Sequence, residues 1–528
     1  MKTIYYNGKV YTGADELQQA FVVKDGVFVY VGDSTSAKGL ADAEDTLVDL
    51  QGHFVCPGFN DSHMHVLGFG KLLGNIQLAG HTDSLSGMIA YLKQEAAALD
   101  GAWILGRGWN QDYFSDVKRM PNRYDLDEVS TEKPICIVRC CGHGLVVNSK
   151  AMELLNLPKD FKQPEGGSIE AEEGRFYDNA MDLIYELMPA PSKEEIKKMI
   201  LASCKKLNAY GVTSAQTDDY CAYSNVDWSL IHEAYKELEE EEALTVRIYE
   251  QSNITSVEDL KRFVEAGNVT GTGSDMYKFG PLKMLGDGAL GARTAFLSIP
   301  YADDETTYGI PVYSKELMES MISYANKNGM QVAVHTIGDA CLDWVIGAYE
   351  KALEECPRED HRHGIVHCQI MRADQWEKIK ALKLHVYAQT IFLDYDINIV
   401  KQRVGEEMAS TSYCWKSLMD GGVTVSNGSD APVELPDVMA GIQCAVTRKT
   451  LNGASEYLPQ EAFSIKEAID SYTIQAAKGS FEEDKKGMIR EGMLADFVIL
   501  DQDLFAIPKD QIKDVKVLET YLGGKRVK

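Results

Sequence analysis

Six side chains that can bind a metal ion are dispersed along the chain, each at the end of a short apolar run. They are His63, His65, Lys283, His335, His367 and Asp430. Enzymes built from repeated strand–helix units place their catalytic groups at the carboxyl ends of different strands, so residues hundreds of positions apart can converge on one site. This pattern predicts a metal-dependent hydrolase.

The first two histidines are separated by one residue, in the segment Asp61-Ser62-His63-Met64-His65. Side chains two positions apart in an extended segment point the same way, so both imidazoles could face a barrel interior and share one Zn²⁺. The alternative is a pair of histidines in a surface turn. The apolar run and Pro57-Gly58 that precede the pair favour the metal site.

The other candidates have alternatives of their own. His335 and His367 each follow a short apolar run, and a single histidine in that place is more often a hydrogen-bonded core residue. Asp430 could be a helix N-cap before Ala431-Pro432. Lys283 could be an ordinary lysine that stabilises Asp287 or a substrate anion.

Alternating strand and helix patterns must position these residues. Such alternation predicts βα units and a parallel sheet. The candidate strands are residues 56–61, 211–216, 245–250, 279–285, 331–335, 364–367, 385–389 and 423–426. The candidate helices between them are residues 192–209, 225–240, 314–328, 339–356 and 373–382. We therefore expect a (β/α)₈ TIM-like barrel.

The two ends of the chain have a different sequence pattern, with short apolar alternations separated by turn residues. Asn7-Gly8 and Asp25-Gly26 separate apolar alternations, which is a hairpin signal. We expect residues 1–56 and 486–528 to form one small β-sandwich and residues 57–485 to form the barrel. An α+β insertion is predicted at about residues 70–190, after the first barrel strand, with strands at 103–106 and 135–139.

Bulk composition limits the partners. A formal net charge of −27 disfavours nucleic acid and anionic membranes, because both are bound by clustered Lys and Arg. The 11 cysteines are odd in number and include no Cys-x-x-Cys pair, which indicates reduced thiols. No signal peptide or membrane-spanning run is apparent. We expect a cytoplasmic protein with a small-molecule substrate, and we leave a homodimer open.

One segment closely resembles a known family. Val55-Cys56-Pro57-Gly58-Phe59-Asn60-Asp61-Ser62-His63-Met64-His65 is similar to the first-strand motif of the amidohydrolase superfamily. Further segments look like its YtcJ-like branch, namely residues 106–111, 142–149, 283–295, 335–339 and 428–433. The resemblance covers nearly the whole chain. One departure is Glu170-Ala171, where many relatives have a basic residue, so specificity is not carried over.

The resemblance implies a metal centre on the barrel. His63 and His65 would bind the more buried ion, His335 and His367 the second, and Asp430 would be the last-strand carboxylate. Lys283 would bridge as a carbamate (N6-carboxylated lysine), because CO₂ addition turns a neutral amine into an anion that can span two cations. Lys278 is the fallback. One or two Zn²⁺ per chain are expected, with other divalent metals as alternatives.

The implied reaction is hydrolysis of a C–N bond in an amide, N-substituted formamide or cyclic amide by a metal-activated water. Asp430 is the expected proton shuttle, and His143 is a second catalytic candidate that could instead structure its loop. Arg107, Trp109 and Gln111 are expected to line the substrate pocket.

Two further alternatives remain open. Arg293 is expected to contact substrate or else to lock the loop after the fourth strand. An ester or lactone hydrolase would use the same site, and a regulatory or ligand-binding protein could keep the fold without turnover.

Overall fold

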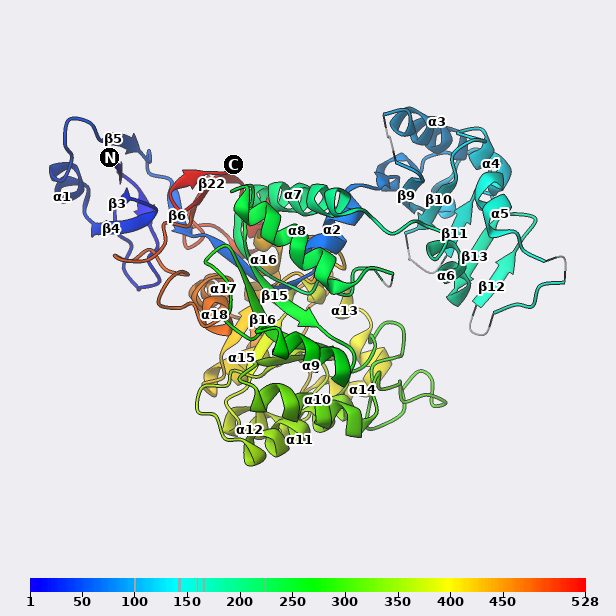
Figure 1. The fold of residues 1–528 in the computed structure, drawn as a ribbon. Coiled ribbons are helices and arrows are strands. Elements are labelled where there is room, and N and C mark those ends of the chain that lie inside the picture. The colour runs from blue at the N-terminus through cyan, green and yellow to red at the C-terminus, as the bar shows by residue number, and fades with distance from the viewer. Residues whose placement is uncertain (99–100, 141–143, 159, 165–166, 224) are drawn as a thin grey trace. The chain divides into compact units, whose positions relative to one another are not determined.

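The computed structural model describes residues 1–98, 101–140, 144–158, 160–164, 167–223 and 225–528. These residues form two compact units (Figure 1). The first comprises Met1–Gly68, Ile200–Ala222 and Trp228–Lys528, and the second comprises Phe69–Met199 and Tyr223–Asp227. Among the helices of the described residues, none has the length and apolar character that crossing a lipid bilayer requires.

An eight-stranded parallel sheet forms the centre of the first unit and confirms the predicted barrel. Its strands in spatial order are β7 (Phe59–Met64), β14 (Val212–Thr217), β15 (Arg247–Asn253), β16 (Tyr277–Leu285), β17 (Val332–Thr336), β18 (Gly364–His367), β19 (His385–Ala388) and β20 (Val425–Asn427). The N–H of Asp430, just after β20, donates to the carbonyl of His63 in β7 at 2.8 Å. The first and last strands therefore meet where the metal-ligand candidates lie.

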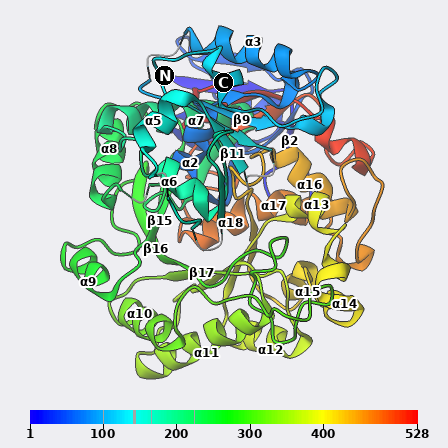
Figure 2. The same ribbon diagram turned by 90° about the vertical axis from the view of Figure 1, so that its right-hand side faces the viewer.

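Helices surround the strands β15 to β17 (Figure 2). They include α8 (Trp228–Glu240), α9 (Val257–Glu265), α10 (Lys315–Lys327), α11 (Asp339–Glu355) and α12 (Ala373–Ala381). The helix predicted at 314–328 begins where expected, because the Ser314 side chain accepts the Leu317 N–H at 3.2 Å as an N-cap. The predicted range 314–328 thus agrees with α10 to within one residue at each end.

Alternation along β15 shows which residues face the barrel interior. Tyr249 donates its hydroxyl hydrogen to Gln331 across the interior, and Gln251, two positions later, contacts His63. Glu250 lies between them and therefore points to the opposite face, toward the helices.

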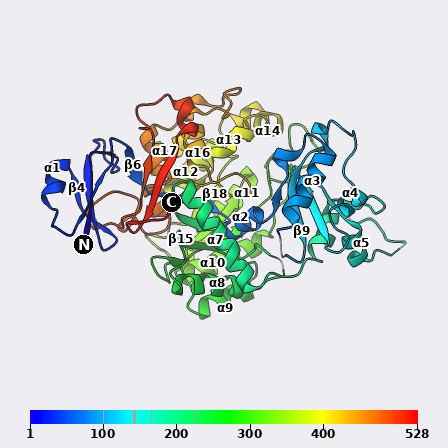
Figure 3. The same cartoon turned by 90° about the horizontal axis from the view of Figure 1, so that it is seen from above.

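Strands from both ends of the chain pair with each other (Figure 3). A five-stranded sheet has the order β2 (Lys9–Val10), β6 (Phe54–Pro57), β21 (Phe497–Leu500), β22 (Val517–Leu522) and β23 (Lys525–Arg526). A four-stranded sheet has the order β4 (Val27–Gly32), β3 (Ala20–Lys24), β1 (Lys2–Tyr6) and β5 (Thr46–Asp49). Phe21, Phe28 and Phe497 belong to one buried core that joins the two ends. The exact boundaries proposed for a β-sandwich domain remain a prediction.

The predicted strand 56–61 needs a correction, because it joins parts of two strands. Strand β6 ends at Pro57 in the terminal sheet, and β7 begins at Phe59 in the barrel. A Cβ at Gly58, between them, would lie 2.3 Å from the Thr213 hydroxyl oxygen. Only glycine allows the chain to pass this close to β14 as it crosses from one sheet to the other.

The second unit contains its own sheet. The order is β12 (Gly167–Glu170), β13 (Arg175–Asp178), β11 (Gly144–Val147), β10 (Ile135–Arg139), β9 (Ile104–Trp109) and β8 (Ile76–Gln77). The two strands predicted at 103–106 and 135–139 correspond to β9 and β10. Glu170 forms an ion pair with Arg175 of the neighbouring strand at 3.0 Å.

A buried ionic cluster anchors the start of β16. Glu482 contacts Lys278 and Lys486, both at 2.7 Å, and all three side chains are buried. Burial would raise the pKa of Glu482, but the two lysine charges lower it to about 2. Lys278 is therefore bound to Glu482, five residues before Lys283, and does not serve as the fallback bridging ligand.

We expect Glu482→Gln to lower the free energy of unfolding by about 3 kcal/mol at pH 7, because it leaves buried lysines without their counter-ion. The depressed pKa of Glu482 adds stability above its unfolded value of 4.5, and this stability is lost as pH falls from 4.5 toward 2. Urea denaturation at pH 7 and pH 3 should show the gap between wild type and variant shrinking. Glu377→Gln, which affects an exposed pair with Lys380, is the control and should cost under about 1 kcal/mol. A gap that is unchanged at pH 3 would contradict the assignment.

Candidate metal centre

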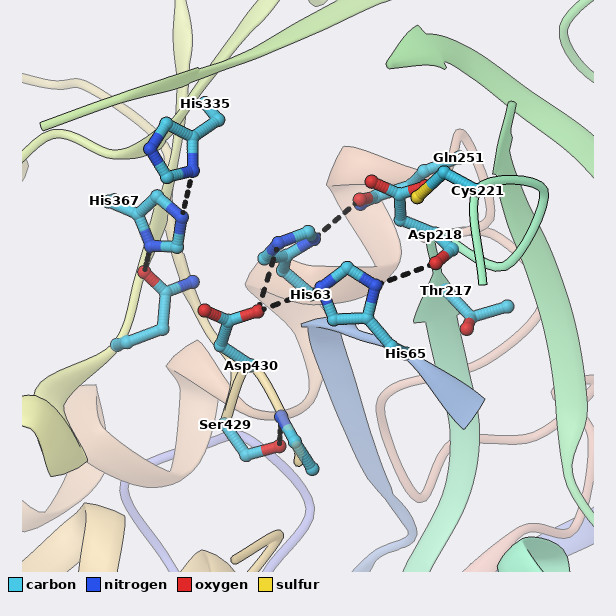
Figure 4. A network of polar contacts seen from close by, with 12 residues as sticks. His63, His65, Thr217, Asp218, Cys221, Gln251, His335, His367, Ser429 and Asp430 are labelled. Carbon is cyan, nitrogen blue, oxygen red and sulfur yellow. Dashed lines mark hydrogen bonds and ion pairs between the residues drawn. The ribbon is translucent and has the colours of Figure 1, made fainter. Parts of the chain in front are cut away.

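His63 and His65 lie at the end of β7 and direct their Nε2 atoms toward Asp430 (Figure 4). The Nδ1 atom of His63 is 2.6 Å from Gln251 Oε1, and the Gln251 amide orientation is fixed because Nε2 donates to the Ser62 carbonyl. The Nδ1 atom of His65 is 2.7 Å from the carbonyl oxygen of Asp218. Both partners are acceptors, so each Nδ1 carries a hydrogen, and the neutral form of each ring presents the Nε2 lone pair toward Asp430.

His335 in β17 and His367 in β18 also place one ring nitrogen against an oxygen acceptor. The Nδ1 atom of His367 is 2.7 Å from Gln389 Oε1, and the Nε2 atom of His335 is 3.2 Å from the Gly288 carbonyl oxygen. The two remaining nitrogens, His367 Nε2 and His335 Nδ1, are 2.9 Å apart. When each outer nitrogen carries its hydrogen, both inner nitrogens present lone pairs, which a shared cation could accept.

Asp430 completes this group from the segment after β20. Its Oδ1 atom is 3.4 Å from His63 Nε2 and 3.1 Å from His65 Nε2. The backbone φ is +57° at Asp430 and +73° at His367, a left-handed conformation that is unfavourable for residues with a Cβ. Such strain is found where the surrounding fold must aim a functional side chain.

The chemistry of this donor set fits a divalent cation. Candidate ligand atoms of His63, His367 and Asp430 all lie within 4.8 Å of one another. Lone pairs and a carboxylate that face one another repel, and a cation between them turns that repulsion into attraction. Two nitrogens on one tetrahedral zinc are about 3.3 Å apart, which is close to the separations seen here.

Electrostatics keep most of these imidazoles neutral, the form that binds metals. Burial, with the charge of Lys283 adding to it, lowers the pKa of His63 well below its usual value. Burial likewise lowers the pKa of His367 to about 4. Burial would also lower the pKa of His65, but the hydrogen bond to Asp430 raises it to about 9. A proton therefore competes with a cation for the His65–Asp430 pair.

Lys283 lies in this centre with its side chain 1% exposed. Its Nζ atom is 3.2 Å from Asp218 Oδ2, and Asn253 donates to the same oxygen at 3.2 Å. Asp218 follows β14, and its candidate ligand atom lies within 4.8 Å of those of His65 and Cys221. The prediction from sequence missed Asp218 and Cys221. The position of Asp218 at a strand end was the signal that could have found it.

The predicted substrate-binding residues lie in different environments. Arg293 forms an ion pair with Asp303 at 2.8 Å, as its alternative role of holding the loop requires. Trp109 is 1% exposed, in the core of the second unit, and Arg107 of the same strand is exposed. Gln111 accepts a hydrogen bond from Arg139 at 3.0 Å. Their roles in substrate binding stay predictions, and His143 lies outside the described residues.

Four further histidines contact polar groups outside this centre. His361 contacts the Leu382 carbonyl oxygen at 2.9 Å, and His363 contacts Asn326 Oδ1 at 3.0 Å. His385 contacts the Ser426 hydroxyl at 2.7 Å, and His232 contacts the Tyr277 hydroxyl at 2.9 Å.

A family model described as the amidohydrolase family matches residues 46–528. YtcJ of Bacillus subtilis (strain 168) is 31% identical over 541 aligned residues, which cover 100% of this chain and 99% of YtcJ. The N-substituted formamide deformylase of Arthrobacter pascens is 24% identical, and the alignment covers 96% of this chain and 94% of the deformylase. A crystal structure of an uncharacterized metal-dependent hydrolase from Pyrococcus furiosus has a TM-score of 0.80 and 30% identity, and covers 95% of this chain and 99% of that one.

Proposed function

The chain belongs to the amidohydrolase family and is a hydrolase, and we propose that it cleaves a carbon–nitrogen bond in a small amide, N-substituted formamide or cyclic amide. The observation that supports this proposal is the convergence of His63, His65 and His367 on one carboxylate, Asp430, with His335 in contact with His367 at 2.9 Å. The relative named as an N-substituted formamide deformylase supports the choice of bond.

The histidines and Asp430 would hold one or two divalent cations, and a nitrogen-rich donor set favours Zn²⁺. When bound, such a cation lowers the pKa of water and polarises a substrate carbonyl. Gln251, Gln389 and the Asp218 carbonyl fix the imidazole orientations, so the ligand geometry exists before a cation binds.

Asp430 is the proposed proton carrier. Burial would raise its pKa, but the hydrogen bond with His65 and the nearby imidazoles hold that pKa well below its usual value. The carboxylate is therefore ionised and able to accept a proton from the attacking water. It then returns the proton to the leaving amine nitrogen, which an amine needs in order to depart.

The test is a panel of amides, N-substituted formamides and cyclic amides with matched esters and lactones, assayed on zinc-loaded protein. Amide turnover that is lost with a chelator and recovered with zinc supports the proposal. Faster turnover of the matched esters would instead identify an ester or lactone hydrolase. Absence of turnover on every member by a fully metal-loaded protein would favour the binding-protein alternative.

We expect Asp430→Asn to reduce turnover roughly 10²–10⁴-fold, the usual contribution of a positioned acid–base group. Excess Zn²⁺ should not restore the rate, because asparagine can offer an oxygen to a metal but cannot carry the proton. Steady-state kinetics with increasing Zn²⁺ measures this. Full recovery at high Zn²⁺ would reduce Asp430 to a metal ligand.

A further inference from the structure

Two short backbone segments hold His65 and Asp218, and side chains fasten them together. The Val66 N–H donates to Thr217 Oγ1 at 2.8 Å, and the Leu67 N–H donates to Asp219 Oδ1 at 2.8 Å. Between these contacts, His65 Nδ1 meets the Asp218 carbonyl oxygen at 2.7 Å. Asp219 thus follows Asp218 directly in the chain. Its side chain also accepts a hydrogen bond from the segment that follows His65.

Asp219 is itself held from the helix layer. Its Oδ2 atom accepts the Tyr235 hydroxyl hydrogen at 2.5 Å, and its N–H donates to Glu250 Oε1 at 3.1 Å. The side chains of Asp219, Tyr235 and Glu250 are fully buried. Tyr235 belongs to α8, and Glu250 points from β15 toward the helices. Both carboxylate oxygens of Asp219 therefore have fixed donors from different elements.

Burying a carboxylate and a phenol hydroxyl between a sheet and a helix costs free energy, because both groups lose their contact with water. Replacing both partners of a buried hydrogen bond by apolar groups of similar shape is often nearly neutral or stabilising. Packing alone would therefore be served by apolar residues. The polar pair instead makes a directional link from α8 to the backbone of His65 and Asp218.

We propose that Asp219 is a positioning residue for the metal centre and that Tyr235 acts through it, a proposal that rests on the proposed function. Asp219 sets the backbone around His65 and Asp218, and Tyr235 fixes the Asp219 carboxylate. Neither residue is a ligand. Their effect is on the geometry that the ligands present, and hence on metal affinity and coordination.

The experiment compares Tyr235→Phe with Tyr277→Phe, using Co²⁺ as the probe. The Tyr277 ring stacks on Tyr235 with centroids 5.0 Å apart, and its hydroxyl contacts Tyr220 and His232. Both variants lose one buried phenol hydroxyl in the same cluster, but only Tyr235→Phe removes a donor to Asp219. We expect Tyr235→Phe to weaken Co²⁺ binding about 10–100-fold and to change the Co²⁺ absorption spectrum. Tyr277→Phe should match wild type in both.

A second pair of variants covers the case in which Tyr235→Phe does not fold. Asp219→Asn keeps the shape and can still pair with Leu67 and Tyr235, so it should retain most Co²⁺ affinity. Asp219→Ala removes both links and should lose it. Equal Co²⁺ affinity and spectra in wild type and Tyr235→Phe would overturn the inference. Equal effects of Tyr235→Phe and Tyr277→Phe on Co²⁺ binding would also overturn it. So would equal Co²⁺ affinities of Asp219→Asn and Asp219→Ala. If wild type itself binds no divalent metal, the proposed function fails and the inference fails with it.

Discussion

The double variant His63→Ala/His65→Ala is expected to retain its fold and lose its metal and its turnover. These residues supply two imidazole nitrogens that face Asp430 at 3.4 and 3.1 Å, and alanine offers no donor atom. Without them the Asp430 carboxylate would also lose its nearest positive or polar partners. Elemental analysis of purified protein, with circular dichroism to verify folding, measures the effect.

The chain supplies its own control for this variant. His361 and His363 form a second His-x-His pair, but they contact the Leu382 carbonyl and the Asn326 side chain rather than residues of the metal centre. His361→Ala/His363→Ala should lower stability and leave the metal content of the folded protein unchanged. Unchanged metal in the His63/His65 variant would mean that the metal is held elsewhere.

Lys283→Ala is expected to lose the second metal, where wild type carries two, together with most turnover. A carbamate on Lys283 would place an anion between two cations that otherwise repel each other in a buried site of low polarity. A short carboxylic acid in the medium should restore part of both by supplying a replacement bridge. Metal content, turnover and intact-protein mass together test this, because a carbamate adds the mass of one CO₂.

The contact between Lys283 and Asp218 provides the competing explanation, in which Lys283 is simply the ammonium partner of that carboxylate. Lys283→Arg keeps a positive charge and cannot form the carbamate, so it should resemble Lys283→Ala if the bridge exists and wild type if it does not. Lys278→Met, on the same strand, should leave metal content intact because Lys278 contacts Glu482. An unmodified Lys283 in fully active protein with two metals would rule out the bridge.

The sequence by itself determined most elements of the barrel and the positions of its candidate metal ligands. Apolar runs and helical spacing are local properties, so strands such as β10 and helices such as α10 could be located before any contact was known. Candidate ligands at strand ends follow from the same periodicity, because parallel strands in a closed barrel bring their carboxyl ends together. The resemblance to the family then implied how two metal ions would divide these ligands, with His63 and His65 on one ion and His335 and His367 on the other.

Tertiary structure decided which side chains actually meet. Two His-x-His pairs have identical spacing, and only their places on the strands separate the pair facing Asp430 from the pair that contacts Asn326 and a carbonyl. The partners that orient the imidazoles, Gln251 and Gln389, come from other strands and have no signature in sequence. The same holds for Asp218 beside Lys283 and for the link from Tyr235 to Asp219. Such contacts depend on strand register and barrel closure, which join residues distant in the chain and are not encoded in any local pattern.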